Sequence, residues 1–451
     1  MESQTDDKQT ELLDRVIDHI EAGDESQLRE MVADLHPGEN ADLLESLPPE
    51  ERNVLWEALP AEQEGEILAH LHDEARATII DEMDHAELVA AAENMDAEDL
   101  VEVLDEMSED LSERIVRSLE DDHRYRLEAV LSYEEGTAGR LMSTEVISVR
   151  KDVTLAVVLR WLRRHNTLPR YTDALMVITP DGRYLGKLDM ATVVTGDPDE
   201  MVATVMHPEA ETVLASSSEH EVAALFERRD LISVAVLDDE DRLLGRITID
   251  DVVDVIRDEA DRTLLASAGL EEDEDLFAPV WPSARRRAVW LGINLITVFV
   301  AAWVIGRFEE ALDKIVALAV LMPVVASMGG IAGSQSLTLT IRGLALDQIS
   351  DSNVRWLTIK EILVGAVNGV AWALVVALVT YLWFHSTGIA GVIAAAMVLN
   401  LLAAAASGVA IPLILVRLKI DPALSGAVIL TTVTDVVGFL SFLGLASLFL
   451  L

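Results

Sequence analysis

Long apolar stretches dominate the second part of the chain. An α-helix needs roughly 20 apolar residues to cross a hydrocarbon core of about 30 Å. Five stretches approach or exceed this length, at residues 288–306, 315–346, 362–383, 388–416 and 423–451. The pattern predicts a transmembrane domain of five α-helices, which we place at residues 285–451.

The N-terminal part has a different pattern, in which short apolar groups alternate with polar residues. Between residues 40 and 131 the apolar positions have helical spacing, and the pattern recurs loosely about every 22 residues. A short amphipathic helix cannot bury its apolar face alone, so successive helices are expected to stack into a superhelix. We therefore expect an all-α domain of acidic helical repeats at residues 1–137.

From about residue 139 the period changes again, and β-branched runs mix with helical segments. A run at 142–149, a helix at 155–164 and strands at 174–178 and 181–188 form one set, which recurs at 205–208, 219–227, 233–237 and 241–248. We expect two α/β units, at 138–198 and 199–257. An acidic helical stretch at 250–265 leads into a connecting, plug-like helix that we place at 258–284.

Charge separates the same two parts of the chain. From residue 277 to the end we count 8 acidic and 10 basic residues, whereas residues 1–276 hold 71 acidic and 24 basic ones. A formal net charge of −45 excludes a nucleic-acid-binding protein, because such a surface repels phosphates. Lysine supplies 6 of the 34 basic residues. This acidic, lysine-poor composition is typical of a halophilic prokaryote, whose salt screens the repulsion.

Several classes of chemistry are missing from the sequence. The chain has no cysteine, which excludes disulfides, thiolate metal sites and cysteine nucleophiles. Residues 1–7 have neither the basic nor the apolar region of a cleavable signal peptide. Since no P-loop is present, a pump driven by ATP hydrolysis is disfavoured, and we expect no enzymatic activity.

Basic residues indicate the orientation of the predicted membrane helices. They lie before the first segment, between the second and third, and between the fourth and fifth: Arg285, Arg286, Arg287, Arg342, Arg355, Lys360, Arg417 and Lys419. The alternate loops carry Glu309, Glu310 and Asp313, or His385. By the positive-inside rule, the N-terminal domains face the cytoplasm, and the protein is a multi-pass protein of the plasma membrane.

Asp435 is the strongest single signal in the membrane part. It lies near the middle of the last apolar stretch, where an ionisable side chain is unfavourable unless it faces water, a partner or an ion. Thr431, Asp435 and Gly438 share one helix face, at i, i+4 and i+7. The sequence predicts a site for a hard divalent cation such as Mg²⁺, completed by a second copy of the chain. The alternative is a protonated aspartate that serves packing.

The second apolar stretch has an unusual composition. Pro323, Gly329 and Gly330 interrupt it, and several serine and threonine residues follow. Irregular backbone at membrane depth is tolerated only against protein or a water-filled path, so these residues are candidates to line a pore. A kinked helix with small residues for close packing is the alternative.

The second α/β unit ends with a recognisable motif. The run Gly245-Arg246-Ile247-Thr248-Ile249-Asp250-Asp251 resembles the signature that ends a CBS unit, and the two α/β units together resemble a CBS-domain pair. This resemblance implies that Thr248 and Asp251 contact the ribose of an adenine nucleotide such as ATP. The first unit reads Gly186-Lys187-Leu188-Asp189-Met190-Ala191-Thr192 and lacks the final aspartate. A purely structural dimerisation module is the alternative.

The order of the parts and several membrane motifs resemble the MgtE family of magnesium channels along nearly the whole chain. The motifs are Phe308-Glu309, the run 323–336, Ile341-Arg342-Gly343-Leu344-Ala345, Asp421-Pro422-Ala423-Leu424 and Thr432-Val433-Thr434-Asp435-Val436-Val437-Gly438. The resemblance implies a homodimer in the lipid bilayer whose second and fifth membrane helices line a pore. It also implies that both copies of Asp435 hold hydrated Mg²⁺.

The resemblance further implies that cytosolic Mg²⁺ closes the pore by bridging acidic residues. The implied regulatory residues are Asp230, Asp251, Asp254, Glu259 and Asp421, with Asp96 and Asp99 as weaker candidates. The sequence departs from the family pattern at Ile331, at Ala427-Val428 and at Arg262.

Taken together, the sequence predicts a self-gated channel or transporter for Mg²⁺ influx. A transporter of Mn²⁺ or Co²⁺, or an exporter, is an alternative of the same class. A membrane-anchored receptor for nucleotides, in which Asp435 is only structural, is an alternative of a different class.

Overall fold

The structure is a computed structural model that describes residues 2–105, 107–164, 167–270, 275–346, 348–350 and 352–451. The chain forms two compact units. The N-terminal unit comprises Met1–Ala260 and Asp273–Pro279, and the membrane unit comprises Asp261–Glu272 and Val280–Leu451. The predicted combination of a helical domain, an α/β pair and five long apolar helices is confirmed.

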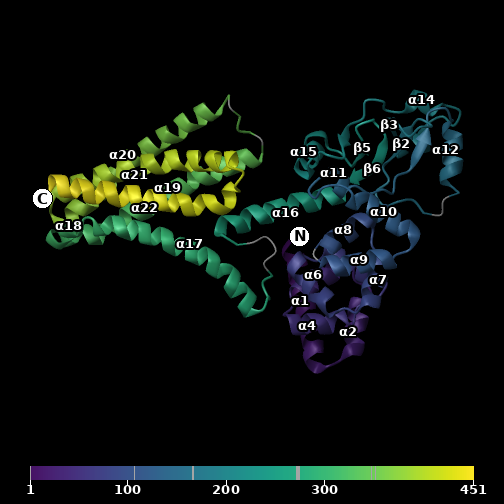
Figure 1. Ribbon diagram of the computed structural model, residues 1–451, viewed down its shortest axis with the longest axis horizontal. Coiled ribbons are helices and arrows are strands. Elements are labelled where there is room, and N and C mark those ends of the chain that lie inside the picture. Colours follow the sequence, from purple (N-terminus) through teal and green to yellow (C-terminus); the bar gives the residue numbers. More distant parts are fainter. Residues whose placement is uncertain (1, 106, 165–166, 271–274, 347, 351) are drawn as a thin grey trace. The chain divides into compact units, whose positions relative to one another are not determined.

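Within the residues that the structure describes, ten helices form the first part of the N-terminal unit (Figure 1). They are α1 (Glu2–Ala22), α2 (Glu25–Val32), α3 (Pro37–Glu45), α4 (Pro49–Trp56), α5 (Glu64–His70), α6 (Asp73–Glu82), α7 (His85–Glu93), α8 (Ala97–Asp105), α9 (Glu109–Ser118) and α10 (Asp121–Leu131). Their apolar faces meet in one continuous core, which includes Leu44, Leu55 and Ile79. We refer to this part as the helical domain.

The helical domain has a repeat of 24 residues, close to the spacing of about 22 that the sequence suggested. The helices α4, α6, α8 and α10 begin at residues 49, 73, 97 and 121, which are 24 residues apart. The fourth residue is arginine in α4, α6 and α10, namely Arg52, Arg76 and Arg124. Each guanidinium donates to the backbone carbonyl of the leucine five residues earlier, where the preceding turn ends.

Two α/β units of the same topology follow. The first has β1 (Ser148–Arg150), α12 (Leu155–Leu162), β2 (Ala174–Ile178), β3 (Tyr184–Asp189) and α13 (Met190–Thr195). The second has α14 (Val202–Val205), β4 (Thr212–Leu214), α15 (Glu219–Arg229), β5 (Ser233–Leu237) and β6 (Leu243–Thr248). In each sheet the first strand pairs in parallel with the second, which pairs in antiparallel with the third. A short helix, α11 (Ala138–Leu141), precedes both units.

The helix that follows the second unit differs in extent from the prediction. We expected a connecting helix at 258–284, whereas α16 runs over Ile249–Ala268 and the next helix, α17, begins at Val280. Gly269 has a φ of 76°, the left-handed conformation that ends many helices. Similarly, the run at 205–208, expected to open the second α/β unit, is not a strand, and β4 begins later, at Thr212.

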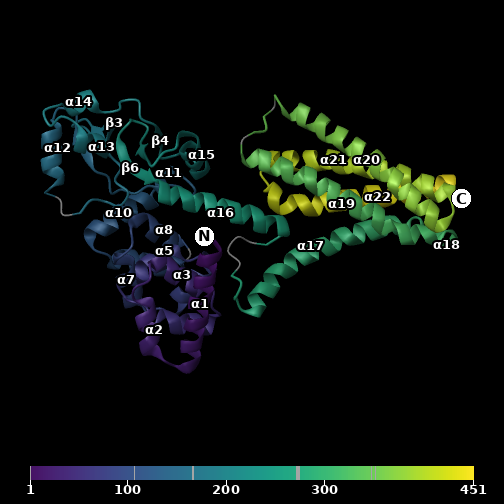
Figure 2. The same cartoon turned by 180° about the vertical axis from the view of Figure 1, so that it is seen from behind.

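In the described part of the membrane unit, five helices are long and apolar enough to cross a membrane. They are α17 (Val280–Gly306), α19 (Val316–Ala345), α20 (Val354–Phe384), α21 (Thr387–Arg417) and α22 (Pro422–Phe449), and a short helix, α18 (Glu309–Lys314), connects the first two. Helices α19, α20 and α22 all pack against α21, as Figure 2 shows from the side opposite to Figure 1. In the most apolar stretch of α21, 50% of the residues are buried, compared with 11% in that of α17. Helix α21 is therefore the central helix of the unit.

The prediction that the second membrane segment is interrupted is wrong. Pro323 and the glycines lie within one α-helix, α19. A Cβ atom on Gly329 would lie 2.2 Å from the side chain of Asn400, and one on Gly333 would lie 2.9 Å from Leu430. At least these two small residues therefore permit close helix packing, whereas a Cβ on Gly330 would meet open space.

Candidate ion sites

The first candidate site is a group of carboxylates on two helices of the N-terminal unit. Helix α8 carries Glu98, Asp99 and Glu102, and the first turns of α16 carry Asp251, Asp254 and Asp258. We call these six residues the acidic cluster. Figures 1 and 2 show α8 beside the start of α16, and the charges of Asp251 and Asp254 act on Asp99.

Crowding and partial burial disfavour ionisation in this cluster. Burial, followed by repulsion from neighbouring carboxylates, raises the pKa of Asp99 to about 7. Burial likewise raises the pKa values of Glu98 and Asp251 to about 7. The charge of Glu98 adds to the repulsion on Asp251, and the charge of Asp251 adds to the repulsion on Asp99. Burial also raises the pKa of Glu102 to about 7 and raises the pKa values of Asp254 and Asp258, whose side chains lie at the more exposed rim of the cluster. A dication would relieve the repulsion by neutralising two carboxylates at once.

Asp251 has a structural role as well as its place in the cluster. Thr248 precedes the first residue of α16, and its backbone N–H donates to Oδ2 of Asp251 at 2.9 Å. The Thr248 hydroxyl donates to the same oxygen at 3.1 Å. The bond from the Thr248 N–H is one half of a capping box, and it helps to fix the start of α16. Thr248 and Asp251, the residues expected to contact a nucleotide, therefore bond to one another.

A cavity of about 500 Å³ lies elsewhere in the α/β pair. Its lining includes the cationic or titratable side chains Lys187, His207 and Arg229 together with Glu209 and Glu211. Arg229 pairs with Glu211 at 3.0 Å. The cavity has the size and the mixed charge that a small anionic ligand could use, but neither Thr248 nor Asp251 lines it.

Among the other expected regulatory residues, Asp96 lies beside the acidic cluster, and its charge acts on Glu98 and Asp99. Asp230 ends α15 with a φ of 52° and is exposed. Glu259, although on α16, contacts Nε2 of His220 on α15 at 3.0 Å. Asp96 directly precedes α8 and is exposed. Asp421 is the N-cap of α22 and accepts a hydrogen bond from the backbone N–H of Ala423 at 2.7 Å.

The second candidate site is Asp435 on α22. Its side chain is half-buried and makes no hydrogen bond or ion pair within the residues that the structure describes. Thr431, one turn earlier, is exposed and donates to the carbonyl of Ala427, and Pro323 on α19 is also exposed. Gly438, one turn later, is buried against Asn400 of α21. The expected shared face thus runs from an open position at Thr431 to a packed one at Gly438.

Asn400 is a residue that sequence reasoning missed. Its side chain is fully buried and lies between Gly329 of α19 and Gly438 of α22. Its Nδ2 donates to the carbonyl of Val325 at 2.8 Å, and its Oδ1 has no partner among the described residues. An asparagine inside an apolar run was the available signal, but the sequence alone does not say which helices it contacts.

Glu361 is a second such residue. It lies on α20, is 3% exposed, and accepts a hydrogen bond from the Ser336 hydroxyl of α19 at 2.7 Å. Lys360 pairs with its other oxygen. From the sequence alone, Lys360 indicated only the orientation of the membrane helices. Across the described part of the chain, no three acidic or histidine side chains converge on a point where a metal ion could sit.

Comparison with known proteins places these features in a family. The profile described as a divalent cation transporter, MgtE, matches residues 322–445, the MgtE intracellular N domain matches 35–136, and the CBS domain matches 202–258. The magnesium transporter MgtE of Thermus thermophilus is 32% identical over 340 residues, which cover 75% of each chain. The chain belongs to the MgtE family.

Two further proteins are similar to parts of this chain. The magnesium transporter MgtE of Bacillus subtilis is 29% identical over 333 residues, which cover 74% of each chain. A solved structure of the cytosolic domain of the Mg²⁺ channel MgtE in complex with ATP is 31% identical, with a TM-score of 0.49; the match covers 53% of this chain and 98% of that one. As in its family, the helical domain and the CBS pair lie in the cytoplasm, and the five long helices cross the membrane.

Proposed function

We propose that this protein mediates Mg²⁺ influx as a homodimer, with Asp435 of each copy at the ion path. The observation that carries the proposal is an ionisable side chain on a membrane-spanning helix that has no partner within the described part of its own chain. Such a side chain is retained in a membrane where it faces water or an ion. The relatives named as magnesium transporters support Mg²⁺ as the cargo.

A second copy supplies what one chain lacks. One carboxylate neutralises only half of a dication, and Mg²⁺ keeps much of its water shell in proteins. Two Asp435 residues related by a two-fold axis would bind the hydrated ion symmetrically through that water. Inward movement of a divalent charge through 100 mV releases about 4.6 kcal/mol, so import requires no ATP hydrolysis.

Cytosolic Mg²⁺ regulates this path through the acidic cluster. Without a cation, the carboxylates of α8 and α16 repel one another, which favours separation of the two helices. A hydrated Mg²⁺ that bridges them favours the compact arrangement, and we propose that this arrangement closes the pore. Asp99, Asp251 and Asp254 carry this role, with Asp96, Asp230, Glu259 and Asp421 as outer contributors.

The CBS pair adds a site for an adenine nucleotide. The cavity lined by Lys187, His207 and Arg229 is better suited to phosphate groups than Thr248 and Asp251, whose polar atoms already bond to one another. If the protein were instead a nucleotide receptor without transport, the nucleotide would bind and no ion would cross. A transporter of Mn²⁺ or Co²⁺, or an exporter, would differ in ion competition or in the direction of flux.

The test is uptake of Mg²⁺ into liposomes that contain the purified protein and a trapped dye. We expect uptake by the wild type, inhibition as Mg²⁺ rises on the side of the N-terminal domains, and no uptake by Asp435→Ala. Asp313→Asn, an exposed acid of α18 outside the spanning helices, is the control and should transport normally. Equal uptake by Asp435→Ala and the wild type would refute the role of Asp435.

A further inference from the structure

Arg52 differs from its repeat counterparts in the helical domain. Its guanidinium is fully buried and the Arg76 side chain is 5% exposed, whereas Arg124 retains 32% side-chain exposure. Its Nε donates to the Leu44 carbonyl at 2.9 Å, and its Nη2 donates to the Leu47 carbonyl at 3.2 Å. Two neutral carbonyls leave the charge of a buried guanidinium uncompensated, which is strongly unfavourable.

The local acid that would compensate this charge is missing from α4. The first residue of α6 is Asp73, and its carboxylate lies 3.6 Å from Arg76. The first residue of α10 is Asp121, which pairs with Arg124. At the same position of the 24-residue repeat, α4 has Pro49, which carries no charge.

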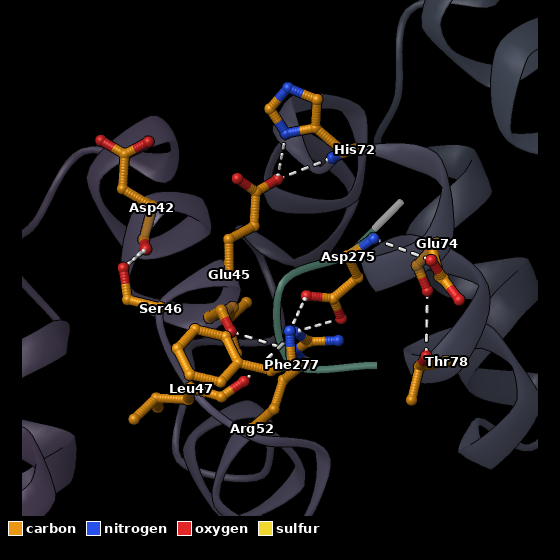
Figure 3. Close-up of polar contacts among 11 residues, drawn as sticks. Asp42, Glu45, Ser46, Leu47, Arg52, His72, Glu74, Thr78, Asp275 and Phe277 are labelled. Atoms are coloured by element: carbon orange, nitrogen blue, oxygen red, sulfur yellow. Dashed lines mark hydrogen bonds and ion pairs between the residues drawn. The ribbon is translucent and has the colours of Figure 1, made fainter. Parts of the chain in front are cut away.

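A residue 223 positions later supplies the missing acid (Figure 3). Oδ2 of Asp275 lies 2.7 Å from Nη2 of Arg52, and the Asp275 side chain is 7% exposed. Among the described residues, this is the one ion pair that Arg52 makes. A charge-assisted hydrogen bond at this depth is among the stronger polar contacts that proteins form.

Further hydrogen bonds shape the segment around Asp275 for this contact. The backbone N–H of Asp275 donates to Oε2 of Glu74 on α6 at 2.8 Å. The Asp275 Oδ1 accepts from the N–H of Phe277 at 2.9 Å, and its carbonyl accepts from Ala278. Residues 275–278, which we call the strap, thus form a turn whose acidic side chain enters the helical domain between α4 and α6.

We propose that Arg52 and Glu74 form a socket that anchors the strap, and with it the approach to the first membrane helix, to the helical domain. Helix α17 begins at Val280, five residues after Asp275, and an extended chain spans at most about 3.5 Å per residue. The anchor therefore limits how far the helical domain can move from the start of α17. It acts together with the acidic cluster, because α8 belongs to the same apolar core as α4.

This inference rests on the regulation proposed above but has a test of its own. The first readout is hydrogen exchange of the backbone amides at residues 275–278 in the full-length protein. We expect Asp275→Asn to accelerate exchange there by about tenfold or more, a change of about 1.4 kcal/mol in local stability. Asp275→Glu, which keeps the charge, should restore part of the protection.

The second readout is the Mg²⁺ concentration that half-inhibits uptake into liposomes. Because the anchor favours the compact arrangement, Asp275→Asn should raise this concentration by about tenfold while uptake at low Mg²⁺ stays unchanged. The matched control is Asp121→Asn, which removes the acid of the corresponding exposed pair in α10 and should change neither readout.

Three results would overturn the proposal or separate it from the proposed function. Unchanged exchange at 275–278 in Asp275→Asn would show that the socket does not hold the strap. Faster exchange with unchanged inhibition would show that the anchor does not limit the helical domain. If the wild type transports no Mg²⁺, the proposed function fails, and the exchange rates alone decide whether the anchor exists.

Discussion

The acidic residues of the N-terminal unit and those of the membrane unit face different surroundings. On α8 and α16, six carboxylates lie near one another, and burial raises the pKa of every one of them. On α22, Asp435 stands alone, while Glu361 on α20 is paired with Lys360 and Ser336. Neighbouring carboxylates can move together when a cation binds between them. A single carboxylate in a packed helix bundle can only bind or release the cation.

The membrane unit and the acidic cluster are also held together by different interactions. The membrane unit is held by close contacts between small residues, which depend on the exact shape of α19, α21 and α22. The acidic cluster depends on charge and therefore on pH and Mg²⁺. Changes in shape should act mainly on the first region, and changes in charge mainly on the second.

The largest effect is expected from Gly329→Ala. A Cβ atom there would lie 2.2 Å from Nδ2 of Asn400, which Gly438 confines from the other side. Separation of α19 and α21 should destabilise the membrane unit by about 2 to 3 kcal/mol, seen as a lower Tm in detergent. The matched variant is Gly330→Ala, whose Cβ meets open space. Equal loss of stability in both would contradict the packing role of Gly329.

A smaller effect is expected from Ser336→Ala. The substitution removes the hydroxyl that donates to the buried carboxylate of Glu361, and hydrogen bonds to charged groups contribute roughly 1.5 kcal/mol or more. The Tm in detergent should fall by less than in Gly329→Ala. Thr358→Ala, which removes a hydroxyl bonded only to the backbone of its own helix, serves as the comparison and should cost less. A larger loss in Thr358→Ala would argue against the link between α19 and α20.

The smallest effect is expected from pH on the acidic cluster without Mg²⁺. The pKa of Asp99 is raised to about 7, so the folded arrangement holds this proton more tightly than the unfolded chain. The resulting stabilisation is full below the ordinary carboxyl range near about 4 and is lost as the pH rises through about 7. Asp99→Asn removes this titration.

Hydrogen exchange of α8 in the full-length protein checks this expectation. Between about pH 5 and pH 8, the wild type should lose about 1 kcal/mol of local stability relative to Asp99→Asn, a value reduced by solvent screening. Mg²⁺ should diminish this difference. A difference that is constant across the range would mean that Asp99 does not titrate in the compact arrangement.

Local patterns in the sequence predicted much of the fold. The apolar stretches predicted five membrane helices, although α17 begins earlier than expected, at Val280. The alternation of β-branched runs and helices predicted both α/β units, because a strand or helix follows from the spacing of neighbouring residues. The family motifs around Asp435 predicted where an ion path should be sought.

Contacts between distant residues could not be predicted in this way. Asn400 was one polar residue in an apolar run until folding placed it between Gly329 and Gly438. Arg52 and Asp275 were an ordinary arginine and one acid among many, and no local spacing relates positions 223 residues apart.

The sequence by itself thus determined which segments are helices, strands or membrane spans, because these depend on residues within one or two turns of each other. Tertiary structure decided which charges are buried and which partners neutralise them. Burial removes the water that would otherwise screen a charge, so the same aspartate is unremarkable on a surface and decisive beside a buried arginine. That difference separates Asp121, exposed beside Arg124, from Asp275, enclosed with Arg52.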